Sequence, residues 1–247
     1  MAAVATIEGA GPARVLVLHG WALDSTVWAM SRSFTDLARF TYAYLDFPGY
    51  GAASKEAPAA GLDEMARDAL AAAGELGWDR FSVLGHSMGG AAAIRLATLA
   101  PDRVHGVVAL TPVAAGGTPL PQDTYAGFDA SFPTPAPVLQ PLAPNLTDRQ
   151  VANLVARCHQ TMDQATWSAY LKNWTGADFV KELGAFPGPV RICYGADDGL
   201  VNAAYLDETV TGLARADLVR LEGAGHYPML EQPEASVAQW EDALRHP

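Results

Sequence analysis

The sequence predicts an α/β protein with a mostly parallel central sheet, helices on both faces and an inserted helical cap. Short runs of β-branched residues and leucine alternate with longer segments that carry apolar residues at helical spacing. This alternation breaks between about residues 112 and 184, where a proline-rich stretch precedes further helical patterns. Strands that alternate with helices form parallel sheets covered on both faces, and the interruption indicates an insertion above the sheet.

The expected strands are short apolar runs bounded by turn signals. They cover residues 14–18, 41–45, 80–84, 104–110, 190–194 and 217–221. The expected helices cover residues 26–38, 62–76, 88–99, 202–212 and 234–245. Connections between parallel strands are right-handed almost without exception, so the hand of the arrangement is also predicted.

The interrupting segment contains eight prolines between residues 112 and 144. Proline at this density predicts neither regular helix nor central strand there. Two helical patterns follow, at residues 147–159 and 163–173. The predicted domains are therefore an α/β core and a cap, with residues 1–112 and 185–247 in the core and residues 113–184 in the cap.

The composition is that of a globular protein, since half of its 247 residues are hydrophobic and 17% are charged. A net charge of -11 and a pI of about 4.8 disfavour nucleic acid and anionic membranes as partners. We expect the two cysteines, Cys158 and Cys193, to be reduced and buried. Neither a secretory leader nor a bilayer-spanning apolar run is apparent, so we expect a soluble, cytoplasmic protein.

Residues 85–89, with the sequence GHSMG, fit the pattern G-x-S-x-G. They follow an expected strand and begin an expected helix, which is the context that this motif requires. The sharp turn exposes Ser87, and the helix N-terminus directs backbone N–H groups toward the group that Ser87 attacks. The motif therefore indicates Ser87 as a catalytic nucleophile.

A serine nucleophile needs a base within hydrogen-bond reach. Among six histidines, His226 is the candidate, because it lies in a glycine-containing loop between the last strand and the last helix. We expect the other five to be structural: His19, His86, His105, His159 and His246. Of these, His19 should brace the loop after the first strand by hydrogen bonding, and His86 should point away from the nucleophile.

The base needs a carboxylate that fixes its tautomer, and the oxyanion needs two N–H donors. Asp197 and Asp198 both follow the strand that ends at Tyr194, and the chain order serine, aspartate, histidine fits either of them. For the oxyanion we expect the backbone N–H groups of Met88, beside the nucleophile, and of Trp21, in the loop after the first strand.

Four motifs make the sequence similar to the α/β-hydrolase superfamily along nearly all its length. They are residues 19–21 (HGW), 46–51 (DFPGYG), 85–90 (GHSMGG) and 225–233 (GHYPMLEQP). The resemblance implies that Asp198 is the acid, that Asp197 is a flanking residue, and that Asp46 stabilises a turn. Within the superfamily, the sequence from His19 to Trp28 resembles the pimeloyl-ACP methyl ester esterase group.

The residues and the resemblance together predict a serine hydrolase that cleaves a carboxylic ester of a small, largely apolar substrate through an acyl-enzyme. We expect Trp21, with Phe128 and Trp167 of the cap, to bind this substrate. No metal or organic cofactor is implied, since the sequence has neither an H-E-x-x-H motif nor a Cys/His cluster. The cap holds four cationic and six acidic side chains, which disfavours an acidic carrier protein as partner.

Two other interpretations stay open from the sequence. The same three residues could serve a lactonase, a carbamate hydrolase, a C–C bond hydrolase or a perhydrolase. Some proteins of this fold act instead as ligand receptors with slow or no turnover. Pocket polarity separates these activities, and the proline-rich cap has no period from which its pocket residues can be predicted.

Overall fold

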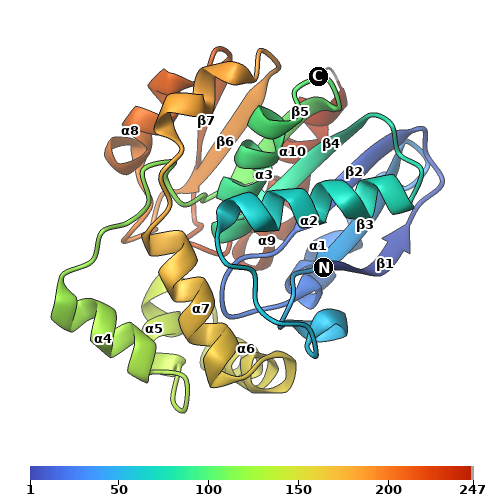
Figure 1. Cartoon of the computed structure of the whole chain (residues 1–247). Helices are drawn as coiled ribbons and strands as arrows, with labels where there is room; N and C mark the ends of the chain where they lie inside the picture. Colours follow the sequence, from blue (N-terminus) through green and yellow to red (C-terminus); the bar gives the residue numbers. More distant parts are fainter. Residues whose placement is uncertain (246–247) are drawn as a thin grey trace.

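The computed structural model describes residues 1–245, which contain one seven-stranded sheet (Figure 1). The strands are β1 (Ala3–Glu8), β2 (Ala13–Leu18), β3 (Phe40–Asp46), β4 (Phe81–His86), β5 (Val104–Leu110), β6 (Val190–Gly195) and β7 (Ala216–Leu221). Their order is β1-β3-β2-β4-β5-β6-β7, and only the β1–β3 pair is antiparallel within the described residues. The predicted mostly parallel sheet is confirmed.

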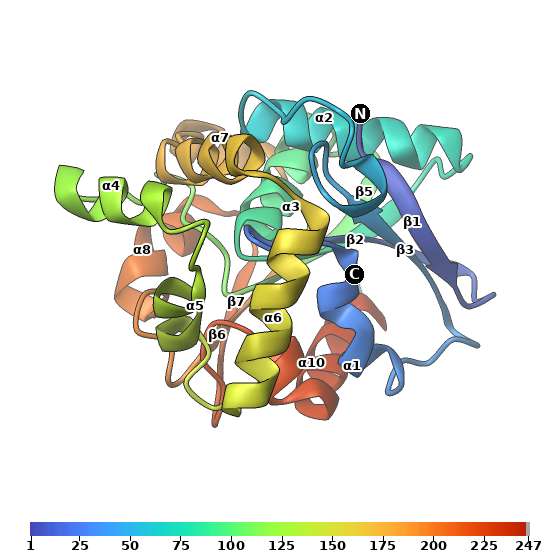
Figure 2. The ribbon, with the colours of Figure 1, turned by 90° about the horizontal axis from the view of Figure 1, so that it is seen from below.

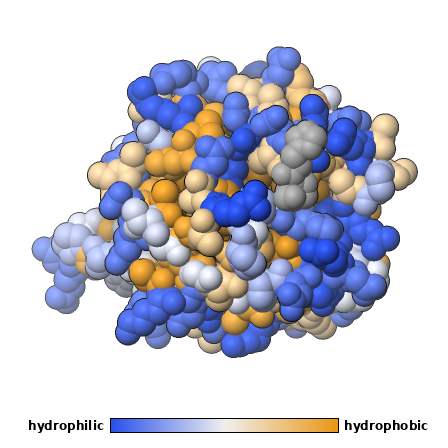
Figure 3. Space-filling model, turned by 90° about the horizontal axis from the view of Figure 1, so that it is seen from above, coloured by the Kyte–Doolittle hydropathy of each residue, from blue (hydrophilic) through white to orange (hydrophobic). Residues whose placement is uncertain are grey.

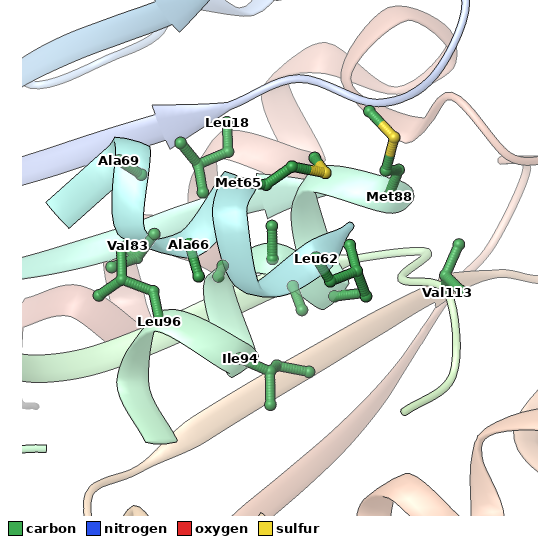
Figure 4. Packing of buried hydrophobic residues seen from close by; sticks show 14 of the residues in the cluster. Leu18, Leu62, Met65, Ala66, Ala69, Val83, Met88, Ile94, Leu96 and Val113 are labelled. Atoms are coloured by element: carbon green, nitrogen blue, oxygen red, sulfur yellow. The ribbon is translucent and has the colours of Figure 1, made fainter. Parts of the chain in front are cut away.

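Helices cover both faces of the sheet, as predicted. One face carries α2 (Leu62–Glu75), α3 (Met88–Leu99) and α8 (Ala203–Gly212), whose buried residues share a core cluster with the strands. Figure 4 shows Met65 and Ala66 of α2 packed with Leu96 of α3 over Leu18 and Val83. The other face carries η1 (Ser25–Trp28), α1 (Ala29–Arg32), α9 (Pro228–Glu231) and α10 (Pro233–Arg245). Complete burial on both faces accounts for the continuous apolar runs in the central strands.

Four further helices fall within the segment predicted as the cap, residues 113–184. They are α4 (Gln122–Ala130), α5 (Ala136–Leu142), α6 (Asp148–Thr161) and α7 (Gln164–Thr175), and η3 (Val180–Ala185) leads back to β6. Figures 1 and 2 show them grouped at one edge of the sheet. The division into core and cap stays a prediction, and "cap" below means residues 113–184.

The prediction that residues 112–144 contain no regular helix was wrong, because α4 and α5 both lie there. Proline is tolerated at a helix start, where the missing N–H would have no partner. Pro121 is the N-cap of α4, while Pro135 and Pro137 lie at the start of α5. Pro141 is the last residue but one of α5. The prolines therefore mark helix boundaries rather than irregular structure.

The helix predicted at residues 26–38 was wrong beyond Arg32, where α1 ends, while residues 26–32 are helical as parts of η1 and α1. The following residues satisfy their polar groups locally: the Thr35 hydroxyl donates to Arg32 O, and an Asp36 carboxylate oxygen accepts from Ala38 N–H and Arg39 N–H. Such bonds compete with helix continuation. Three of the apolar residues that suggested a helix face are exposed, Met30, Phe34 and Leu37, whereas Val27 is buried. Strand β1 and the short helices η2 (Gly51–Ala53) and α9 were not predicted.

The parallel strands direct their carboxyl ends toward the cap, so the loops after them meet beneath it (Figure 2). The loops after β2, β4, β6 and β7 carry the candidate site residues. In open α/β sheets, ligands bind at this edge of the sheet. Figure 3 views the molecule from the opposite side to Figure 2 and shows a face where hydrophilic residues alternate with apolar ones.

Candidate active site

Ser87 occupies the turn between β4 and α3 with φ 53° and ψ -119°, a conformation that residues other than glycine rarely adopt. Its N–H donates to Leu110 O at 2.9 Å, which holds the turn against β5. Gly89 permits the close packing beside it, because a Cβ atom there would lie 2.3 Å from His19 O. A strained serine at the carboxyl end of a central strand is typical of a nucleophile turn.

His226 lies between Ser87 and Asp198 and contacts both. Its Nδ1 is 2.8 Å from Asp198 Oδ2, and its Nε2 is 2.9 Å from Ser87 Oγ. A carboxylate can only accept, so Nδ1 carries the proton of the neutral ring and Nε2 accepts from the Ser87 hydroxyl. The three residues are 5–8% exposed. The structure therefore brings together three side chains that are far apart in the sequence.

Asp198 is held in its charged form by its neighbours. Burial raises its pKa, but His226 and the N–H groups of Val201 and Leu200 outweigh this and hold the pKa below the usual value. One carboxylate oxygen accepts from Leu200 N–H at 2.9 Å and Val201 N–H at 3.0 Å, while the other faces His226. An ionised, fixed carboxylate can orient an imidazole and stabilise an imidazolium.

Asp197, the other candidate acid, points elsewhere. Its carboxylate accepts from Asn145 Nδ2 at 3.0 Å, and its N–H donates to Ala224 O at 2.9 Å. The same Asn145 side chain donates to Gly223 O at 3.1 Å. Asp197 therefore connects the loop after β6 to the cap, and the geometry leaves Asp198 as the partner of His226.

The two expected oxyanion donors lie at the start of α3, next to Ser87, and in the loop after β2. Met88 is the first residue of α3, so its N–H has no partner within the helix. Trp21 follows β2 and precedes Ala22, which has a φ of 73°. The Trp21 indole N–H donates to Trp167 O at 3.0 Å, but among residues 1–245 no protein group accepts from the Trp21 backbone N–H. Both groups are thus available to a ligand oxygen, and their function as oxyanion donors stays a prediction.

His19 braces this loop, as predicted. Phe47 N–H donates to His19 Nε2 at 3.1 Å, which leaves the proton of the neutral ring on Nδ1. His19 Nδ1 in turn donates to Gly20 O at 2.8 Å. Burial lowers the pKa of His19, so the ring stays neutral and this pattern of hydrogen bonds is kept. Asp46, predicted to stabilise a turn, accepts from Ser25 N–H and Ala52 N–H.

A narrow cavity opens beside Ser87 and His226. Its other lining residues are apolar or tyrosine: Trp21, Val113, Phe128, Leu142, Trp174, Leu200, Val201, Tyr205 and Tyr227. Trp21 and Phe128, which were expected to bind the substrate, both line this cavity, and their binding role stays a prediction. Trp167 does not line the cavity. Its side chain is fully buried, and the centroid of its ring lies 3.9 Å from that of Trp21. Trp174, two helical turns further along α7, lines it instead.

The remaining histidines include one whose orientation was predicted wrongly. His86 does not point away from the site, since its Nε2 lies 2.7 Å from His226 O. His159 contacts Phe132 within the cap, and His105 is exposed on β5, away from the cavity lining. His246 lies outside the described residues. The two cysteines are unpaired and buried.

Residues 1–245 hold neither a cluster of metal ligands nor a helix that could span a membrane. No group of three or more histidine, cysteine or acidic side chains is arranged to hold a metal ion. No helix in that range has the length and apolar character that crossing a membrane requires.

Comparison with known proteins decides the family. The model of the alpha/beta hydrolase family matches residues 15–240. The chain belongs to this family. A pimeloyl-[acyl-carrier protein] methyl ester esterase of Nitrosomonas europaea is 33% identical over 96% of both chains, and one of Pectobacterium carotovorum is 32% identical over 94% of both.

Solved structures agree with this α/β hydrolase in fold. A thermophilic esterase from Thermogutta terrifontis superposes with a TM-score of 0.83 at 21% identity, over 98% of this chain and 93% of the other. An enol-lactonase from Burkholderia xenovorans superposes with a TM-score of 0.83 at 22% identity, over 97% and 95%. At these identities the likeness concerns the fold alone.

Proposed function

We propose that this α/β hydrolase is a carboxylic ester hydrolase that cleaves small, largely apolar esters through an acyl-enzyme on Ser87. The observation that carries the proposal is the hydrogen-bonded series Ser87–His226–Asp198 at 2.9 and 2.8 Å, which opens into an apolar cavity. The relatives that are about a third identical over nearly the whole chain are named as methyl ester esterases, which supports the same chemistry.

In the first half of the reaction, Ser87 Oγ attacks the ester carbonyl carbon while His226 Nε2 takes the hydroxyl proton. The imidazolium formed is stabilised by Asp198, whose carboxylate is ionised. The C–O bond to the alcohol then breaks, and His226 returns the proton to the leaving oxygen. A water molecule, activated by His226, releases the acid by the same steps. The cycle consumes one ester and one water molecule and needs no other reactant.

Negative charge on the carbonyl oxygen requires donors that are already in place. The backbone N–H groups of Met88 and Trp21 are our proposed donors, because neither donates to a protein group within residues 1–245. Preorganised donors cost no reorganisation during the reaction, and losing one typically lowers kcat about 10²- to 10³-fold.

We infer that the substrate is a free small molecule rather than an acyl group on a carrier protein. The cap holds four cationic side chains, and one of them, Arg157, is occupied by an ion pair with Asp24. Six acidic side chains in the same segment would repel an acidic partner. The cavity lining contains no cationic side chain, which favours an uncharged acyl group.

Turnover of p-nitrophenyl acetate, butyrate and octanoate tests the proposed activity. We expect hydrolysis by the native protein and a loss of at least about a thousandfold in kcat for Ser87→Ala. Ser82→Ala is the matched control, because Ser82 is also a buried serine on β4 but does not contact His226. Full activity in Ser87→Ala, or no turnover of any ester, would contradict the proposal.

The identity of the acyl donor is tested by a direct competition. The methyl ester of a medium-length acid should be hydrolysed at least as efficiently when free as when the same acyl group is attached to an acyl carrier protein. A much higher kcat/KM for the carrier-bound ester would overturn the free-substrate inference and leave the ester hydrolase intact. We also propose a cytoplasmic location, in line with two buried thiols, and cell fractionation tests it.

A further inference from the structure

The backbone on both sides of His226 is fixed by hydrogen bonds from elements far from it in sequence. Its carbonyl oxygen accepts from the Thr111 hydroxyl at 2.9 Å and lies 2.7 Å from His86 Nε2. Its N–H donates to Leu142 O at 2.7 Å. A carbonyl oxygen has two lone pairs, so the Thr111 and His86 bonds use its full capacity. The position of the imidazole is thus set through the peptide groups that carry it.

His86 is suited to donate permanently to this carbonyl. Burial lowers its pKa well below the usual value, with the nearby His226 as a further cause, so the ring is neutral at working pH. A neutral ring has one N–H, and a carbonyl oxygen only accepts, so the proton resides on Nε2. His86 Nδ1 faces Gly20, where a Cβ atom would lie 2.6 Å from it. The His86 ring is therefore packed between the loop after β2 and the loop that carries His226.

Thr111 adopts a backbone conformation that a β-branched residue avoids. It follows β5 directly, is fully buried, and has a φ of 42°. Its N–H donates to Cys193 O at 2.6 Å, which fixes the residue between β5 and β6. Strain of this kind persists where the surroundings require it and is concentrated at functional sites. Here it accompanies the hydroxyl's hydrogen bond to the His226 carbonyl.

We propose that Thr111 and His86 are positioning residues for the base, and that they keep His226 Nε2 in hydrogen-bond distance of Ser87 Oγ. Neither residue lines the cavity, so they act through His226 and do not contact the substrate. The proposal rests on the proposed function, in which His226 moves a proton between Ser87 and the leaving alcohol. A backbone held at the carbonyl and at the N–H limits the swing of the imidazolium while it carries that proton.

Thr111→Val is the direct test, because it keeps the shape and branching of the side chain and removes the hydroxyl. We expect kcat for p-nitrophenyl butyrate to fall about tenfold, the effect of one lost hydrogen bond, with KM within twofold of the native value. Thr111→Ser, which restores the hydroxyl, should recover most of kcat. The rate at which a p-nitrophenyl phosphonate modifies Ser87 should follow the same order, since that reaction also needs the base.

His86 gives an independent test if Thr111→Val folds poorly. Gln can place an amide N–H near the position of His86 Nε2, whereas Leu cannot donate, so His86→Gln should retain clearly more kcat than His86→Leu. Thr98→Val is the matched control for Thr111→Val, because Thr98 is a buried threonine whose hydroxyl donates to Arg95 O on α3. It should keep native kcat.

The positioning proposal would be overturned by native kcat in Thr111→Val, or by a loss of kcat in Thr111→Ser as large as that in Thr111→Val. Equal kcat in His86→Gln and His86→Leu would also overturn it. A loss in Thr98→Val as large as in Thr111→Val would do the same, because it would reveal a general packing effect. The proposed function fails separately, and visibly, if the native protein neither turns over esters nor reacts with the phosphonate.

Discussion

Arg157 of α6 and Asp24 form an ion pair that joins the cap to the loop after β2. Arg157 Nε lies 3.2 Å from Asp24 Oδ1 and 2.9 Å from Thr26 Oγ1, and Nη2 contacts Asp24 Oδ2. Asp24 is only 1% exposed, and it also accepts from Thr26 N–H as the N-cap of η1. Because Asp24 is three residues from Trp21, this pair connects a cap helix to the loop of a proposed oxyanion donor.

Arg157→Ala should therefore destabilise the protein by about 1–2 kcal/mol, since it leaves a buried carboxylate without its cation. Arg149→Ala is the matched control, because Arg149 lies on the same helix and is exposed. Urea unfolding at pH 7 measures both changes. Equal effects of the two substitutions would indicate that the ion pair contributes nothing specific.

The same pair predicts a pH dependence. Burial raises the pKa of Asp24, but the hydrogen bonds and charge of Arg157 outweigh it and hold the pKa below the usual value. A depressed pKa stabilises the folded state above the unfolded-state value of about 3.9, and this contribution is lost as the pH falls through the folded-state pKa. The stability difference between the native protein and Arg157→Ala should therefore be constant above about pH 5 and shrink below pH 4. A difference that grows on acidification would contradict this assignment.

The acid assignment predicts a contrast between neighbours. Asp198→Asn should lower kcat on the order of a thousandfold or more, because an amide can no longer fix the His226 tautomer and stabilise the imidazolium. Asp197→Asn keeps an oxygen for Asn145 Nδ2 and should change kcat by a few-fold at most. Steady-state kinetics on one p-nitrophenyl ester decides between them. A larger loss in Asp197→Asn would reverse the assignment.

The sequence was sufficient for the parts of the fold and site that depend on local patterns. Strands β2 to β7 and the turn at Ser87 follow from apolar runs, glycines and their spacing. Asp198 could not be separated from Asp197 by pattern, because the choice depends on where the loop after β6 directs each side chain. Trp167 and Trp174 are seven residues apart and share one side of α7, so helical spacing could not tell which of them lines the cavity. Both rings contact Trp21.

Other features depended on long-range contacts that carry little sequence signal. Strand β1 is recognisable only through its antiparallel pairing with β3, since its alternation of exposed and half-buried residues is weak. The orientation of His86 is set by a carbonyl 140 positions away along the chain. The left-handed conformation of Thr111 could not be expected from a β-branched residue, and it appears only in the backbone angles.

Glu231 connects the cap to the loop that carries His226. One of its carboxylate oxygens accepts from Asn145 N–H at 3.1 Å, and the other accepts from Gly225 N–H at 2.8 Å and Tyr227 N–H at 3.1 Å. Glu231→Gln would place an amide NH₂ against one of these donors, so it should lower stability by about 1–3 kcal/mol and also reduce kcat. Glu234→Gln, on the exposed first turn of α10, is the control that should change neither. Unchanged thermal unfolding in Glu231→Gln would refute the connection.

The lining of the cavity predicts that a smaller side chain at its wall changes the preference for the length of the substrate's acyl chain. Phe128 and Trp174 both line the space beside Ser87, and their rings are 6.4 Å apart between centroids. Phe128→Ala should open one wall, so the ratio of kcat/KM for p-nitrophenyl octanoate to that for the acetate should rise several-fold, since each buried methylene contributes about 0.8 kcal/mol. Phe132→Ala is the matched control, because the Phe132 ring packs against Trp167 and does not line the cavity. If both variants shift the ratio equally, the preference reflects general loosening of the cap, and Phe128 is not a wall of the acyl site.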